Sequence, residues 1–168
     1  VADLLDTMYA QNGVGLAAPQ IGENYRVFVI DVSTGNEPLN PIVFINPKII
    51  KKSGAVISHE GCLSFPEAFT DVRRYSDVMV KAMDRNGRSF VLEAKDGSLL
   101  ARAIQHEFDH LDGILFIDHV INRFEAEEVL KKFNLPPIQI EKLLDEPELE
   151  AKIEELLKQK RKFLLMNR

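Results

Sequence analysis

Residues 96–113 read DGSLLARAIQHEFDHLDG, and their apolar side chains recur at the spacing of one face of an α-helix. Ser98 suits the N-cap position ahead of this run, and Gly113 suits the turn that ends it. We therefore expect a helix between these two residues. It is predicted to be the buried central element around which the strands gather.

The rest of the chain predicts strands before this helix and further helices after it. Residues 1–9 have helical spacing, and a loop with three glycines and a proline follows at 12–22. Segments rich in β-branched and aromatic residues predict strands at 25–32, 42–46, 54–60, 70–84 and 88–95. A further strand, which contains His119, is predicted after the central helix. Helices are predicted near 123–133 and 148–166.

These elements indicate an α+β fold with mostly antiparallel strands packed around the central helix and a helical C-terminal extension. The length of 168 residues predicts a single catalytic domain, with a core of about 1–122 and the extension at about 123–168.

Composition excludes several classes of protein. The chain is 45% hydrophobic and 28% charged, and it lacks an apolar run of about 18 residues, which argues against a membrane span. A net charge of −5 disfavours general binding to DNA. The single cysteine cannot form an internal disulfide, and the N-terminal residues do not have the pattern of a signal peptide. We therefore expect a cytoplasmic protein.

The motif H-E-x-x-H lies within the predicted central helix. At about 100° per residue, His110 lies only about 40° around the helix from His106, so both imidazoles can reach one metal ion. Glu107 lies to one side of that ion, where a carboxylate can act as a general base. A catalytic site of this kind needs a third protein ligand.

Counting along the chain leaves the third ligand open. Phe116 stands where the extended protease pattern H-E-x-x-H-x-x-G-x-x-H requires its last histidine. A second protease arrangement, with a downstream glutamate, keeps Glu127 and Glu128 as candidates. The other candidates are His59, His119 and Cys62.

Three segments in order, GVGLAAPQ (13–20), EGCLS (60–64) and QHEFDHLDG (105–113), resemble the signature motifs of peptide deformylases. The similarity extends from Tyr9 to about Val120. It implies a metal held by Cys62, His106 and His110, with water in the fourth position. It also implies Fe(II) as the native ion, and Zn(II), Ni(II) or Co(II) suit the same ligands.

The resemblance implies hydrolysis of the N-formyl group from the initiator methionine of nascent polypeptides, with release of formate. In this pattern the Gln20 side chain and the Leu63 backbone N–H stabilise the oxyanion, and Glu107 protonates the departing amine. Alternative functions are a zinc endopeptidase and a noncatalytic, metal-stabilised binding module.

Further residues are expected to bind the substrate. Val14, Gly15 and Gly61 would let an extended peptide pair with exposed backbone. Leu99, Arg102 and Ala103 share the helix face of His106 and are expected to line or rim the methionine pocket.

Glu60 is expected to form an ion pair with Arg74. The resemblance also implies possible contact of the C-terminal helix with the ribosome, and a segment with one more strand before the first helix. Because this sequence opens inside that helix and lacks an initiator methionine, we expect it to be part of a longer chain.

Overall fold

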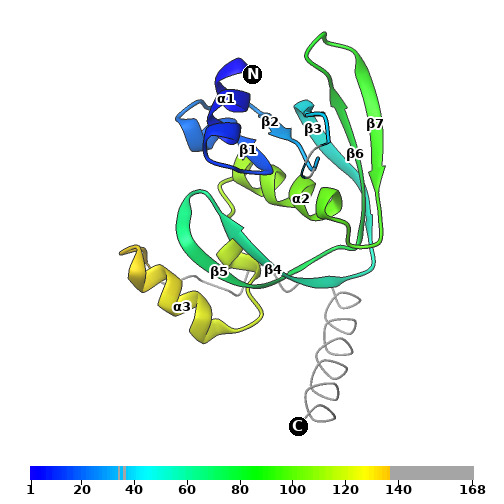
Figure 1. Cartoon of the computed structure of the whole chain (residues 1–168). Coiled ribbons are helices and arrows are strands. Elements are labelled where there is room, and N and C mark those ends of the chain that lie inside the picture. Colours follow the sequence, from blue (N-terminus) through cyan, green and yellow to red (C-terminus); the bar gives the residue numbers. More distant parts are fainter. Residues whose placement is uncertain (34, 36, 137–168) are drawn as a thin grey trace. The chain divides into compact units, whose positions relative to one another are not determined.

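The computed structural model describes residues 1–33, 35 and 37–136 (Figure 1). The elements in chain order are α1 (Ala2–Ala10), β1 (Gly15–Ala17), η1 (Ala18–Ile21), β2 (Val27–Ile30), β3 (Ile42–Ser53), β4 (Val56–Cys62), β5 (Phe65–Arg74), β6 (Asp77–Met83), β7 (Ser89–Ala94), α2 (Leu99–Leu111), η2 (Phe116–His119) and α3 (Arg123–Lys132), where η denotes a 3₁₀ helix. Every strand pairing is antiparallel. The predicted α+β class is confirmed.

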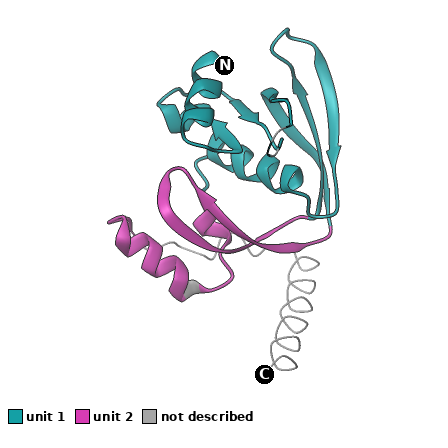
Figure 2. Cartoon of the chain, in the orientation of Figure 1, with its two compact units in different colours: residues 1–53, 76–115 teal, residues 54–75, 116–168 magenta. Residues whose placement is uncertain are grey.

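The chain divides into two compact units, coloured separately in Figure 2. The first contains Val1–Ser53 and Ser76–Leu115, and the second contains Gly54–Tyr75 and the described residues from 116 to 136. The prediction of one catalytic domain over residues 1–168 stays a prediction.

The first unit is built on a five-stranded sheet in the order β1-β2-β3-β6-β7, with β1 at one edge. The helices α1 and α2 both contact β1 and β2. Leu4 and Met8 of α1 are buried in one hydrophobic cluster with Leu16 of β1, Val29 of β2 and Val43 of β3. Burial of these apolar side chains fixes the strand register, because a slip of one residue would turn the same side chains toward water.

The second unit is built on the β4–β5 hairpin. Phe65 of β5 packs edge-on against Phe116 and Phe133, with ring centroids 5.5 and 5.1 Å away. The chain after η2 also joins the hairpin, since Val120 forms a β-bridge with Val72. Aromatic contacts and the bridge thus hold η2 and the end of α3 to β5.

The ends of α2 follow the predicted signals. The Ser98 side chain accepts a hydrogen bond from the Ala101 N–H at 3.3 Å. At the other end Gly113 has a φ of +72°, and the Ile114 N–H donates to the Asp109 carbonyl at 3.0 Å. This is the Schellman pattern, in which a left-handed residue satisfies the last carbonyls of a helix.

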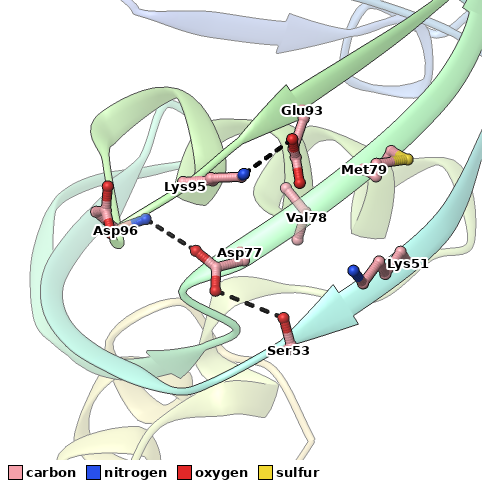
Figure 3. Close-up of a pocket in the computed structure, with 8 residues that line it drawn as sticks. All are labelled: Lys51, Ser53, Asp77, Val78, Met79, Glu93, Lys95 and Asp96. Carbon is pink, nitrogen blue, oxygen red and sulfur yellow. Dashed lines mark hydrogen bonds and ion pairs between the residues drawn. The ribbon is translucent and has the colours of Figure 1, made fainter.

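A polar corner anchors the loop that leads into α2. Figure 3 shows this surface hollow, in which the Asp77 carboxylate accepts hydrogen bonds from the Asp96 N–H at 3.0 Å and the Ser53 hydroxyl at 3.5 Å. Lys95 and Glu93 form an ion pair at 3.0 Å beside it. Because Asp77 begins β6, these contacts connect the start of α2 to the sheet.

Several strand predictions need correction. The predicted strand 70–84 is wrong, because the chain turns at Tyr75 and Ser76 and forms parts of β5 and β6 instead. Ser76 accepts a hydrogen bond from the Gly97 N–H and donates its own hydroxyl to the Ser53 carbonyl, contacts that hold this turn. The predicted strand at 42–46 continues to Ser53.

One residue lies in an element other than the one expected. His119 ends η2 rather than lying in a strand, because residues 116–119 adopt a single 3₁₀ turn. The predicted helix at 148–166 lies outside the described residues. Within those residues, no helix is long and apolar enough to cross a membrane.

Candidate metal centre and active site

The two histidines of α2 face one another across one helical turn. Their ring centroids are 5.0 Å apart with an interplanar angle of 77°. His110 is buried and His106 is half-buried. The i, i+4 spacing places both rings on one face of the helix, as the sequence predicts.

Cys62 ends β4 at an irregularity in the hairpin. Register along β4 and β5 is regular up to the pair Gly61 and Phe69 and then shifts, so that Cys62 lies opposite Phe65. At this shift residues 66–68 of β5 are not opposite any residue of β4, and the chain turns at Leu63 and Ser64. The result is a thiol carried by a tight turn rather than by the middle of a strand.

One ligand atom from each of Cys62, His106 and His110 lies within 4.8 Å of the other two. Among the described residues this is the only such cluster of three, and it includes neither His59, His119 nor the pair Glu127 and Glu128. His59 instead contacts Asp71, 3.1 Å from its Nδ1 atom. Of the ligand candidates left open by the sequence, the geometry therefore favours Cys62.

The donor set fits a divalent transition metal. Tetrahedral coordination with Zn–S and Zn–N bonds of about 2.0–2.3 Å places ligand atoms roughly 3.3–3.8 Å apart. Small side-chain rotations suffice to reach this spacing from a cluster with a 4.8 Å limit. A thiolate with two imidazoles suits Fe(II), Zn(II), Co(II) and Ni(II).

Glu107 is buried beside His106, with only 5% of its surface exposed. Its carboxylate and Cγ lie directly against Gly15 of β1, where an added Cβ would be 2.5 Å from Oε1 and 2.9 Å from Cδ and Cγ. Any larger residue at 15 would therefore displace this carboxylate. The sequence predicts a substrate-binding role for Gly15 but did not reveal this contact, since the two residues are far apart in the chain.

Gln20 lies in η1, directly after β1. Its side-chain Oε1 accepts a hydrogen bond from the Ala17 N–H at 2.9 Å. Since the oxygen is turned toward Ala17, the amide NH₂ group is the end of the side chain that points away from that backbone. The contact gives this side chain a defined orientation.

Comparisons with known proteins agree with this site. The sequence profile of the family described as polypeptide deformylase matches residues 1–126. This chain belongs to the peptide deformylase family. The predicted activity, that of a metal-dependent hydrolase of this family with a Cys-His-His metal site, is confirmed.

Individual relatives cover most of the same region. Peptide deformylase 1 of Clostridium perfringens is 52% identical over 119 residues, which are 71% of this chain and 78% of the relative. Peptide deformylase of Thermodesulfovibrio yellowstonii is 47% identical over 133 residues, 79% of each chain. The crystal structure of a Synechococcus elongatus peptide deformylase in complex with actinonin is 47% identical, with a TM-score of 0.72 over 79% of this chain and 72% of that one.

The predicted ion pair between Glu60 and Arg74 is confirmed. Arg74 Nη2 lies 3.2 Å from Glu60 Oε2, and the two side chains are 2% and 8% exposed. The Ser58 hydroxyl also donates to Glu60 at 3.2 Å. A charge buried this deeply is stable only with such partners, so in this deformylase the pair holds the buried face of the hairpin just before Cys62.

A buried polar network behind the first motif was not predicted. The Asp31 N–H donates to the Val14 carbonyl at 2.9 Å, and the Asp31 carboxylate accepts from the Tyr9 hydroxyl at 2.6 Å. Burial alone would raise the pKa of Asp31, but hydrogen bonds from Ser33, Tyr9 and Asn40 outweigh it and hold this pKa below its usual value. Burial and the neighbouring carboxylate raise the pKa of Tyr9 to about 12.

The remaining predicted site residues differ in exposure. Val14, Leu63 and Leu99 are 43%, 37% and 38% exposed, while Ala103 is buried. Arg102 is half-buried, and its Nε donates to the Gly97 carbonyl at 3.1 Å. Their roles in catalysis and substrate binding stay predictions.

Proposed function

We propose that this chain removes the formyl group from N-formylmethionine at the start of nascent polypeptides. The bond that breaks joins the formyl carbon to the methionine nitrogen, and the products are formate and a free amino terminus. The observation that carries this proposal is that Cys62 of β4 clusters with His106 and His110 of α2, the helix on which Glu107 is buried.

Cys62, His106 and His110 would hold the metal, with Fe(II) as the native ion. When bound, such an ion polarises a carbonyl oxygen and lowers the pKa of a coordinated water toward neutrality. The thiolate of Cys62 adds negative charge to the ligand set, which makes that water less acidic than one held by three neutral imidazoles. The reaction therefore depends more strongly on a protein base.

Glu107 is that base. Its carboxylate takes a proton from the attacking water and delivers it to the departing methionine nitrogen. Its position next to His106 in the chain supports this role, and so does the packing of the carboxylate against Gly15. Burial away from water strengthens its interactions with the reacting groups.

The negative charge that develops on the formyl oxygen, when water attacks the formyl carbon, needs hydrogen-bond donors that are already in place. We assign these donors to the Gln20 amide and the Leu63 backbone N–H. The hydrogen bond from Ala17 to Gln20 Oε1 supports the first assignment, because it turns the NH₂ group away from the loop. The place of Leu63 directly after Cys62 supports the second.

The substrate would bind as an extended strand. β1 is an edge strand that begins at Gly15, next to Val14, and β4 contains Gly61, so both offer backbone for strand addition. Pairing through backbone atoms tolerates varied sequences after the methionine. Leu99, Arg102 and Ala103, on the His106 face of α2, would surround the methionine side chain.

Release of formate from a formyl-Met peptide by anaerobically purified, Fe(II)-loaded protein tests the proposal. Glu107→Gln keeps the size of the side chain but removes the base, and we expect kcat to fall by about 10²- to 10⁴-fold with metal content unchanged. Glu128→Gln is the matched control, an exposed glutamate on α3 whose change should leave kcat unaltered. Absence of formate release by the wild type would refute the proposal.

Cys62→Ala separates this function from the endopeptidase alternative. We expect the variant to lose both bound metal and formate release. If bound metal and activity instead survived in Cys62→Ala and were lost when Glu127 or Glu128 was changed, the endopeptidase function would be the correct one. A binding module does not need a general base. If the function of the protein in the cell were retained in Glu107→Gln, the noncatalytic binding module would be favoured.

We also propose a cytoplasmic enzyme that acts on chains at the ribosome, with the C-terminal residues as the contact. Five basic residues between Lys158 and Arg168 support an affinity for ribosomal RNA. Residues 137–168 lie outside the described part of the chain. Deletion of residues 147–168 should reduce co-sedimentation with ribosomes, and unchanged co-sedimentation would remove this proposal.

A further inference from the structure

The β4–β5 hairpin carries an exposed aromatic side chain opposite Gly61, the residue that precedes Cys62. Phe69 of β5 is 64% exposed. An isolated exposed phenylalanine is ordinary in a folded protein. Phe69, however, is held by two contacts on the same hairpin, one with His59 and one with Gly61.

The Phe69 ring stacks on the His59 ring, with centroids 6.0 Å apart and an interplanar angle of 20°. His59 Nδ1 lies 3.1 Å from Asp71 Oδ1, so a neighbour of Phe69 on β5 also restrains the imidazole. These contacts limit the rotation of the Phe69 ring although it faces solvent. A ring that is already ordered loses little conformational entropy when a ligand packs on it.

Gly61 allows the ring to lie across β4. A Cβ built on Gly61 would be 2.5 Å from Phe69 Cε1 and 2.6 Å from Cδ1, so the ring occupies the space that a side chain at 61 would fill. Within the described part of the chain, β4 has β5 as its only neighbouring strand. The Phe69 ring thus covers part of β4. The other edge of β4, the one that does not pair with β5, is called the open edge.

Alternation along β4 places this ring on a defined face. Along the regular part of β4, Glu60 lies on the buried face, and His59 and Gly61 belong to the opposite face, where Phe69 lies. A substrate strand added at the open edge of β4 alternates in the same way. If its methionine side chain points to the buried face that carries Glu60, the next side chain points to the face of Phe69.

We propose that Phe69 forms a binding subsite for the residue immediately after the formylmethionine and that it favours an aromatic side chain there. This inference rests on the proposed deformylase function. Pairing through backbone atoms does not depend on the side chains of the substrate. Phe69 would add a preference for the side chain at the second position. The side chain of the third substrate residue points to the same face as the methionine side chain. It therefore does not contact the Phe69 ring.

The test compares kcat/KM for formyl-Met-Phe-Ala, formyl-Met-Ala-Phe and formyl-Met-Ala-Ala, with formyl-Met amide as a substrate that ends before the subsite. For the wild type we expect formyl-Met-Phe-Ala to exceed formyl-Met-Ala-Ala by roughly 2- to 12-fold, the range of one aromatic pair contact. Formyl-Met-Ala-Phe should match formyl-Met-Ala-Ala.

Three variants locate the effect. Phe69→Ala should bring the ratio of formyl-Met-Phe-Ala to formyl-Met-Ala-Ala close to 1 while the rate with formyl-Met amide stays within about twofold, and Phe69→Tyr should retain the wild-type ratio. Phe124→Ala is the matched control, since this phenylalanine is 79% exposed on α3. Its ratio should equal that of the wild type.

A wild type that cleaves every substrate with equal efficiency would overturn the inference and leave the deformylase function intact. A preference for phenylalanine at the second position that persists in Phe69→Ala would also overturn the inference and leave the deformylase function intact. A preference for phenylalanine at the third position that Phe69→Ala removes would show that the assignment of faces is wrong. A wild type that releases formate from none of the four substrates would instead refute the proposed function itself.

Discussion

Replacement of Gly15 by alanine tests whether β1 holds in place the carboxylate of Glu107, the general base that we propose. The new methyl carbon would lie 2.5 Å from Glu107 Oε1, whereas ordinary contacts begin at about 3.4 Å. The carboxylate therefore has to retreat by about 0.9 Å. The burial of Glu107 leaves it little room to do so without moving its neighbours.

The expected effect is a large loss of kcat with metal binding preserved. A misplacement of about 1 Å in a catalytic group costs on the order of 10²-fold in rate, equivalent to about 2.7 kcal/mol of transition-state stabilisation. This is at the lower end of the loss expected when Glu107 is removed altogether, because the base is still present. The three atoms nearest to the new methyl group all belong to Glu107, so metal content should stay at the wild-type level.

Steady-state formate release and metal analysis measure these two quantities. Gly87→Ala is the control for stability, since Gly87 has a φ of +78° at the β6–β7 turn with no neighbouring atom within 4 Å of the new Cβ. It should lose about 1–2 kcal/mol of unfolding free energy and keep its kcat. A difference in kcat between the two variants therefore reports position rather than stability.

A double-mutant cycle with Glu107→Asp sharpens the test. Aspartate is one methylene shorter and relieves part of the clash, so the two changes should cost less together than the sum of the single losses. Strict additivity would contradict the reasoning. A Gly15→Ala variant that keeps kcat within twofold, or that loses its metal, would refute it.

Further predictions concern the buried polar groups. Tyr9→Phe should lower the free energy of unfolding by about 1.5–3 kcal/mol, because it removes a hydrogen bond to the buried Asp31 carboxylate, while Tyr25→Phe, at a site 67% exposed, should change it little. Since the pKa of Tyr9 is raised from 10.0 to about 12, its contribution is fully present below pH 10 and is lost as the pH rises toward 12. Urea unfolding across this range should show the difference between wild type and Tyr9→Phe shrinking, and a constant difference would contradict it. The pKa of Asp31 is lowered from 3.8, so its contribution is present above that pH and is lost as the pH falls through the lowered value, which acid titration of unfolding would detect. Arg74→Met should cost about 3–5 kcal/mol because it leaves the Glu60 charge buried without its guanidinium, and the double variant Glu60→Gln/Arg74→Met should recover most of that loss. No recovery in the double variant would show that packing rather than charge accounts for the effect.

The sequence alone determined the helix that carries the chemistry. Ser98 and Gly113 mark the ends of α2 because a cap and a left-handed turn act through hydrogen bonds within a few residues. The spacing of His106 and His110 follows from the 3.6-residue repeat of the same helix. These features are local, so neither requires knowledge of the rest of the chain.

Tertiary structure decided what lies opposite that helix. Counting along the chain kept several third ligands open, and Cys62 joins the histidines only because a register shift ends β4 at that residue. The turn at Tyr75 was hidden because the buried valines on its two sides, Val72 of β5 and Val78 and Val80 of β6, keep an even spacing in the sequence. The contact of Gly15 with Glu107 depends on how α2 packs against β1. Such contacts join residues distant in sequence, and they form only when burial of apolar side chains brings whole elements together.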